Sequence, residues 1–489
     1  MSSILFYYQV LESADAGDEK AITAMGLLNT METILAVMEE RSEVHAALEP
    51  VILQAIHHIY TNSIMEFYEE AMSLSCDLTS KRISPDMWKM LEVMYTVFQR
   101  DGFDYFSDMM PALHNYVTVD TATFLSSPDY MMAMYNMCKT MLEGDPGEDP
   151  ECHAAKLLEV IILQCKGMNI DQAIPIFVEL VLKRLTREVK TSELRTMCLQ
   201  VIIAALHYNP ALLLEILDKI QIPGMQGGVF RHFLQQWLHD TDCFIGLHDR
   251  KLCVLGLVHL LQMPDNAAVT EQSQQLIPSA LLLFDGLKRA YAARDAEDSD
   301  DEGDSDEEGI DSELLDSDED EIDEEGQQYL ESLQEKVNKG AAGSGFKVNA
   351  TIEDEDEEDD DDDDEDYDGC EETSLEAYTT PLDDEDCPID EYNVFREVLG
   401  GMQGSNPGWY QQLTGHLSEN QGKALTEVIT LANQRIAAKE SKAIEQQGGK
   451  IFHLCRNILQ LNVIFPGYQF SQANVPTGFN FGAPTAFGK

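Results

Sequence analysis

The chain has 489 residues, 44% of them apolar, and a formal net charge of −57. That length allows several domains or one long repeat array, and a charge of this sign favours basic partner proteins over direct binding of nucleic acid. The apolar stretch 4–10 is short and has no basic flank, so we expect neither a secretory signal nor membrane insertion.

The ten cysteines never form a Cys-x-x-Cys pair, and most, such as Cys165 and Cys198, lie on apolar helical patterns. Disulfide and zinc frameworks both need a recurring spacing. We therefore predict reduced core thiols, with a disulfide or zinc framework as the alternative.

Residues 1–294 are expected to form helical repeats, because apolar residues recur there at helical spacing and strand alternation is missing. One clear stripe includes Leu194, Cys198 and Val201. Thr191 and Ser192 are its candidate amino-terminal caps, and Asn209-Pro210 ends it. Two further helices are predicted to start at Ser84-Pro85 and Ser127-Pro128, where a capping hydroxyl precedes proline.

Two patterns recur along this region. Proline stands inside an apolar helical pattern at Pro111, Pro175 and Pro278, and a helix with arginine near its start follows, as at Arg195 and Arg250. A kinked helix followed by a straight one is typical of HEAT-type helical pairs. The fold class predicted is all-α, a HEAT-repeat-like superhelical solenoid, and the alternative is an unspecialised helical bundle.

Residues 295–391 carry 46 aspartates and glutamates and only three lysines. In an extended chain, neighbouring carboxylates are roughly 3.5 Å apart, well within the Debye length of about 8 Å at physiological salt. We expect a mostly disordered acidic loop that attracts strongly basic proteins. Its unbroken run is the predicted cargo-binding site: Glu353, Asp354, Glu355, Asp356, Glu357, Glu358, Asp359, Asp360, Asp361, Asp362, Asp363, Asp364, Glu365 and Asp366.

Ser299, Ser305 and Ser317 each have an acidic residue three positions downstream. This spacing suits acidophilic kinases, and phosphate would deepen the negative field. The alternative is that these serines are solubilising spacers.

Residues 392–449 are predicted to form a closing helical hairpin, whose second helix begins after Leu417 and is capped by Ser418 with Gln421. Residues 450–489 are expected to be an apolar insert, 450–467, and a disordered tail. The tail ends in two Phe-Gly pairs that resemble the motifs of nuclear pore proteins, with a plain flexible tail as the alternative: Phe481, Gly482, Phe487 and Gly488.

No catalytic motif is present: the sequence lacks His-Glu-x-x-His, a phosphate-cradling glycine loop and Gly-x-Ser-x-Gly. His57-His58 is a candidate metal pair, but adjacent residues on a helix point apart. The acidic run lacks the glycine turn of a calcium loop, so diffuse counterion binding is the better interpretation. We predict a binding protein with no enzymatic activity, no cofactor and no metal site.

Several longer segments resemble the importin-β superfamily of nuclear transport receptors, closest to the importin seven and importin eight group. These segments are 101–111, 151–160, 185–195, 248–251, the acidic loop, 390–392 and 479–482. The resemblance covers the carboxy-terminal half of such receptors, whose Ran-binding repeats lie in the amino-terminal half.

The resemblance implies a receptor that carries basic cargo, such as ribosomal proteins and histones, between cytoplasm and nucleus through nuclear pores. It also implies partnership with importin-β, contact with nucleoporin Phe-Gly repeats, and cargo release by Ran-GTP. The rival hypothesis is a histone-chaperone-like or scaffold protein that shields basic proteins without crossing the pore.

Overall fold

The protein is described from a computed structural model, which covers residues 17–38, 41–222, 228–301, 374–384, 387–439 and 441. The chain divides into two compact units. One comprises Met1–Tyr291 with Glu371–Lys489, and the other is Ala292–Cys370. Of the second unit, the structure describes only the end of one helix, residues 292–301. All other described elements belong to the first.

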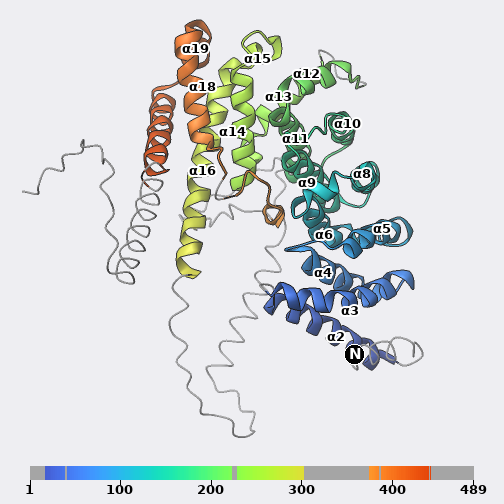
Figure 1. Ribbon diagram of the computed structural model, residues 1–489. Helices are drawn as coiled ribbons and strands as arrows, with labels where there is room; N and C mark the ends of the chain where they lie inside the picture. Colours follow the sequence, from blue (N-terminus) through green and yellow to red (C-terminus); the bar gives the residue numbers. More distant parts are fainter. Residues whose placement is uncertain are drawn as a thin grey trace, which may run out of the picture. The chain divides into compact units, whose positions relative to one another are not determined.

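The described residues contain helices and no strand, which confirms the predicted all-α class. Most helices of the first unit belong to two packed rows (Figure 1). Row A contains α3 (Ser42–Thr61), α5 (Pro85–Arg100), α8 (Pro128–Glu143), α10 (Ile174–Leu185), α12 (Pro210–Lys219) and α13 (Val229–His239). Row B contains α2 (Gly17–Val37), α4 (Tyr68–Thr79), α6 (Phe106–Thr118), α9 (Glu148–Gln164), α11 (Ser192–Tyr208), α14 (Leu247–Leu261) and α18 (Glu391–Ser405).

Shorter or later elements complete the unit. The connecting turns are η1 (Met65–Phe67), η2 (Phe103–Tyr105), α7 (Thr121–Phe124), η3 (Thr241–Cys243), α15 (Ala267–Glu271) and η4 (Ser374–Ala377). The remaining helices are α16 (Ser273–Asp301), α19 (Pro407–Thr414) and a helix over 419–439.

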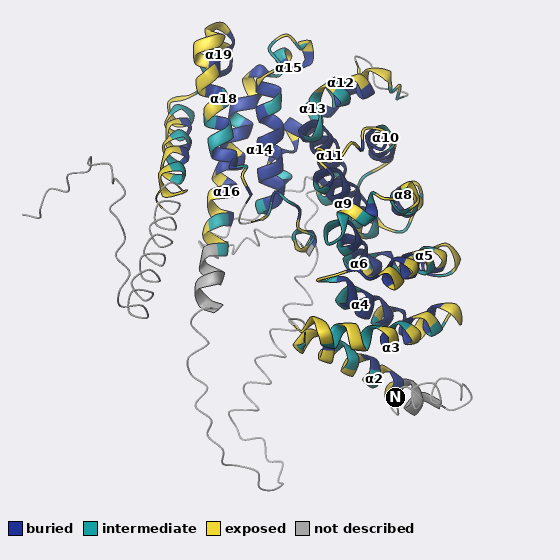
Figure 2. Cartoon of the chain, in the orientation of Figure 1, coloured by how far each residue is buried: buried dark blue, intermediate teal, exposed yellow. Residues whose placement is uncertain are grey.

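Row B supplies the largest share of the core. Helices α9, α11 and α14 are buried nearly all round, whereas α5 and α8 alternate buried and exposed faces (Figure 2). Each helix of row B packs against its neighbours in the row. All buried apolar residues of the described chain except Ala290 form one contiguous cluster from Ala24 to Ala432. A repeat array is stabilised by such nearest-neighbour contacts.

The predicted helix starts are confirmed. The Ser84 hydroxyl accepts a hydrogen bond from Met87 N, and the Thr191 hydroxyl accepts one from Leu194 N. Ser127 caps α8, and Asn209 both ends α11 and caps α12. In each case a side-chain oxygen satisfies an amide that the first turn leaves unpaired.

The proline pattern is confirmed in two of three places. Pro111 and Pro278 lie inside α6 and α16. Pro175, in contrast, lies in the first turn of α10, where proline lacks only an amide that the helix does not use.

The two arginines near helix starts link each repeat to later residues of the array. Arg195 Nε donates to Asp240 Oδ2 at 2.6 Å, and Arg250 Nη1 donates to Gly286 O at 3.0 Å. Glycine is required at 286, because a side chain there would collide with the Arg250 guanidinium.

The closing helices differ partly from expectation. Ser418 and Gln421 form the predicted reciprocal cap, with the Ser418 amide donating to Gln421 Oε1 and the Gln421 amide donating to Ser418 Oγ. Between the two predicted helices, however, Asn406-Pro407-Gly408 begins a further helix, α19. The Trp409 indole then donates to Leu261 O at 2.8 Å and holds α19 to the end of α14.

The largest difference concerns residues 374–390, which the sequence assigned to the acidic loop. Residues 374–384 and 387–390, here called the strap, contact helices of row B. Leu375 and Leu382 of the strap are buried in the core cluster. Buried leucines within this acidic segment thus anchor the end of the acidic loop to the core.

Several predicted features lie outside the described residues: the run Glu353 to Asp366, Ser305, Ser317, the insert 450–467 and the Phe-Gly pairs. Ser299 falls within the range of α16, and its side chain is not described.

Candidate functional site

The first half of the strap is held by two histidines of row B. His114 of α6 donates from Nε2 to Thr379 O at 2.7 Å, and its ring packs against Tyr378 with centroids 5.6 Å apart. The ring of His153, from α9, also packs against Tyr378, with centroids 5.9 Å apart. These contacts fix the point at which the chain returns from the acidic insertion to row B.

The second half is held by His248 of α14. Its Nδ1 lies 2.8 Å from Asp383 Oδ1 on the strap, and its Nε2 lies 2.9 Å from Glu159 Oε1 on α9. A carboxylate can only accept, so both ring nitrogens donate and the ring is an imidazolium. Lys156 completes the cluster, with Nζ 2.9 Å from Glu159 Oε2. We call Lys156, Glu159, His248 and Asp383 the strap cluster.

The strap cluster is buried, since only 1% of the Lys156 and Glu159 side chains and 4% of His248 are exposed. Burial and Lys156 lower the pKa of His248, but Asp383 and Glu159 outweigh them and raise it to about 10. Burial opposes ionisation of Asp383, yet His248 holds the pKa of that carboxyl well below its usual range. The four groups are therefore charged at neutral pH and compensate one another.

Two further charged residues of α14 lie near the strap or the strap cluster. Lys251 Nζ donates to Leu382 O. Burial raises the pKa of Asp249 to about 6, although Lys156 and His248 oppose the shift. Gly246, just before α14, has φ +84°, and a side chain there would collide with the Glu376 carboxylate of the strap.

An acidic edge runs along row B near the start of the strap. The first turns of α4, α6, α9 and α11 contain Glu69, Asp108, Asp149 and Glu193. Burial and Glu69 raise the pKa of Asp108, and burial and Asp149 raise that of Glu193. Burial is the larger cause of both shifts, and the repulsion between neighbouring carboxylates adds to it. A basic partner would relieve that repulsion.

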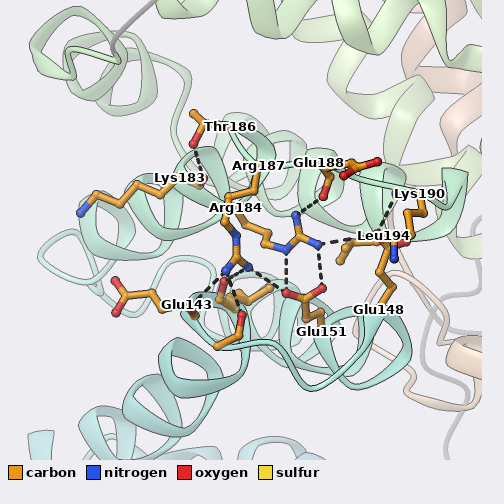
Figure 3. Close-up of polar contacts among 12 residues, drawn as sticks. Glu143, Glu148, Glu151, Lys183, Arg184, Thr186, Arg187, Glu188, Lys190 and Leu194 are labelled. Carbon is orange, nitrogen blue, oxygen red and sulfur yellow. Dashed lines mark hydrogen bonds and ion pairs between the residues drawn. The ribbon is translucent and has the colours of Figure 1, made fainter.

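A second ion cluster, the repeat latch, joins consecutive loops (Figure 3). Glu151 of α9 accepts two hydrogen bonds from Arg184, at 2.6 and 2.8 Å, and one from Arg187 at 2.9 Å. Arg187 also donates to Leu142 O, and Glu148 accepts from the amides of Lys190 and Thr191. The latch fixes the turn between α10 and α11 against the start of α9.

The predicted histidine pair and the cysteines show no metal site and no disulfide among the described residues. His57 and His58 each lie near a residue of the following turn, Thr61 and Asn62, and no cluster of metal-ligating side chains occurs among the described residues. The eight cysteines in the described ranges are free thiols. Within those same ranges, no helix is long and apolar enough to cross a membrane.

Sequence reasoning missed the strap cluster. Its signal was His248-Asp249-Arg250-Lys251, a run of charged residues opening an otherwise apolar helix. Lys156 and Glu159 likewise interrupt a helix that is apolar nearly all round. Charged residues are seldom fully buried without partners, so the charged residues in these apolar helices indicated that each has a polar or charged partner.

The fold and the site thus define an all-helical repeat protein whose acidic insertion is anchored to its own core. Residues 25–341 match a family model described as Importin-11-like, TPR repeats. The chain therefore belongs to the importin-β family.

Three curated relatives extend this result. The chain is 50% identical to Importin-8 of Danio rerio over 429 residues, 87% of this chain and 40% of the relative. It is 46% identical to Importin-8 of Homo sapiens over 467 residues, 95% of this chain and 42% of the relative. A more distant match, 26% identical over 284 residues, is the Probable importin-7 homolog of Dictyostelium discoideum, covering 56% of this chain and 26% of that protein. The chain spans about two fifths of the first two relatives, and no solved structure matches it significantly.

Proposed function

We propose that this chain acts in nuclear import as a receptor segment that binds basic cargo proteins, such as ribosomal proteins and histones. The observation that carries the proposal is the acidic edge, Glu69, Asp108, Asp149 and Glu193, close to the place where the strap begins. The run Glu353 to Asp366 lies eight residues before Ser374 in the sequence. Fixed carboxylates and a polyanion together suit a lysine- and arginine-rich cargo.

The mechanism is charge neutralisation. A basic cargo bound to carboxylates loses its non-specific contacts with nucleic acid, because those contacts depend on the same positive charges. Binding of this kind weakens as salt rises, since ions screen the attraction. In the proposed cycle, Ran-GTP releases the cargo, and importin-β and nucleoporin Phe-Gly repeats are the other partners.

Replacing Glu353 to Asp366 by a Gly/Ser linker of equal length tests the role of the run. We expect weaker binding of a histone or ribosomal protein and a flatter dependence of affinity on salt. The matched control replaces Glu69 and Asp108 by their amides and measures the same two quantities. Unchanged affinity and salt slope in both variants would refute the charge mechanism.

Row A offers two hollows whose linings combine apolar and polar side chains, and their apolar parts suit phenylalanine rings. One, of about 610 Å³, lies between α10 and α12 and includes Pro175, Leu212 and Ile216. The other, of about 630 Å³, lies between α3 and α5 and includes Leu53 and Met90. We propose these as docking sites for nucleoporin Phe-Gly repeats, because aromatic rings gain most from concave apolar surfaces.

A histone-chaperone-like protein remains the second candidate, since the acidic edge alone would shield a basic protein. The two functions differ in their need for Phe-Gly repeats. Capture on immobilised nucleoporin repeats, lost in Leu212→Glu and Leu53→Glu variants, favours import. Binding of histones without binding of the Phe-Gly repeats favours the histone-chaperone-like function.

A further inference from the structure

After η4, the strap lies across row B as a non-helical peptide that is bound through main-chain carbonyls, the Tyr378 ring and the Asp383 carboxylate. Between Tyr378 and Asp390 no described residue is helical. His114 donates to the carbonyl of Thr379, and Lys251 donates to that of Leu382. Every peptide offers carbonyls, so the side chains that distinguish the strap are the buried Leu375 and Leu382, the Tyr378 ring and Asp383, and of these only Asp383 is charged.

The surface beneath the strap carries an excess of positive charge. Its buried charged side chains are Lys156, His248, Lys251, Glu159 and Asp249, three cations and two carboxylates. Asp383 supplies the third carboxylate and balances the set. The surface therefore fits an acidic segment and disfavours a basic one, in contrast to the acidic edge.

The strap also presents its carboxylate in a preformed turn. The Thr380 amide and hydroxyl both donate to Asp383 Oδ2, at 2.7 and 3.0 Å. The Leu382 amide in turn donates to the Thr380 hydroxyl at 3.2 Å. A ligand held in its bound shape loses less conformational entropy when it binds, so this turn has the properties of a recognition motif.

We propose that row B between α6 and α14 is a binding surface for an extended acidic peptide. The strap is its resident ligand, and an acidic segment of a partner protein exchanges with the strap there. The strap is joined to the chain at both ends, so its high effective concentration favours it over a partner segment of equal intrinsic affinity. The partner segment binds when the contact between Asp383 and His248 is weakened. The proposal concerns an acidic ligand and is independent of basic cargo.

The test uses the whole chain and a fluorescently labelled synthetic peptide of residues 374–390. Anisotropy titrations compare wild type with Asp383→Asn, an isosteric change that weakens the resident strap. We expect the peptide to bind the Asp383→Asn chain at least tenfold more tightly than wild type. Adding His248→Gln to that chain should abolish the gain, as should a peptide that itself carries Asp383→Asn.

Amide hydrogen exchange of the strap in the Asp383→Asn chain decides between interpretations. Faster exchange in the strap together with tighter peptide binding supports the proposal. Faster exchange without peptide binding shows that the surface is not a peptide site. Unchanged exchange shows that the strap is a permanent part of the core. Equal binding of a scrambled peptide of the same composition indicates general charge attraction and also overturns the proposal.

Discussion

The repeat latch and the strap cluster are both buried ion clusters, but they join parts of the chain at very different separations. In the latch, Arg184 and Glu151 are 33 residues apart, and Arg187 reaches Leu142 over 45 residues. In the strap cluster, His248 is 89 residues from Glu159 and 135 from Asp383. A repeat array needs only neighbouring contacts. The latch therefore belongs to the array, whereas the strap cluster serves to position the strap.

The two clusters also differ in their exposure to solvent. The Arg187 side chain of the latch is 41% exposed, whereas 17% of Asp383 is the largest exposed fraction in the strap cluster. Burying ions costs several kcal/mol each unless partners compensate them. Removing one partner should therefore cost more in the strap cluster than in the latch.

The largest effect is expected for Glu159→Ala, which leaves Lys156 and His248 buried without their shared carboxylate. Removing one partner of a buried ion pair costs about 3–5 kcal/mol in free energy of unfolding. Urea denaturation monitored by circular dichroism measures the loss. Glu151→Ala in the latch is the matched control and should lose less, because solvent reaches Arg187. A larger loss for Glu151→Ala would reverse the comparison.

The local features of the repeats and the strap cluster differ in how far the sequence predicted them. Helix caps at Ser84, Thr191 and Ser418 depend on residues three or fewer positions apart, so local patterns predict them. The arginines at 195 and 250 were visible as a repeated feature, although their partners were not. Short-range sequence patterns thus predicted the helices and the recurring pattern of the helical repeats.

The strap was not predicted, for two physical reasons. Acidic composition dominates residues 295–391 and masks single apolar anchors such as Leu375 and Leu382. A contact between His248 and Asp383 depends on tertiary structure, and nothing in the spacing of the two residues indicates it. Buried charges at Lys156 and Glu159 show that partners must exist but do not identify them.

The second effect concerns the pH dependence of the contact between Asp383 and His248. The pKa of His248 is raised in the folded chain to about 10, above its ordinary value of 6.5. Its contribution to stability is therefore complete below pH 6.5 and is lost as pH rises towards 10. We expect Asp383→Asn to lose about 2 kcal/mol at pH 7, the value of a charged hydrogen bond, and less at pH 9.5.

Nuclear magnetic resonance titration of the His248 ring checks the cause directly. The pKa of His248 should fall in Asp383→Asn, because a neutral amide no longer favours the imidazolium. A pKa that stays near 10 would mean that Glu159 alone is sufficient to keep the His248 ring protonated. A stability difference that grows with pH would contradict the assigned sign.

A smaller effect is expected for Arg184→Lys in the latch. Lysine keeps the charge but replaces the planar two-point contact with Glu151 by a single ammonium. We expect a loss of about 1–2 kcal/mol from the missing hydrogen bonds. Arg184→Met, which removes the charge as well, should cost more in the same urea titration. No loss in Arg184→Lys would show that the bidentate geometry contributes nothing.

The smallest effect is expected one residue away, at Lys183. Its ammonium lies 2.8 Å from Glu179 Oε1, as close as Lys156 is to Glu159, but the two side chains are 59% and 48% exposed. Water already solvates both charges, so the pair gains little when it forms and loses little when it breaks. Lys183→Ala should change the free energy of unfolding by about 0.5 kcal/mol or less, and 1 M salt should remove that difference. Salt should leave the loss in Glu159→Ala almost intact, because a buried pair is screened much less. Ion pairs of similar length would then differ in stability according to their burial, and equal salt sensitivity in the two variants would disprove that.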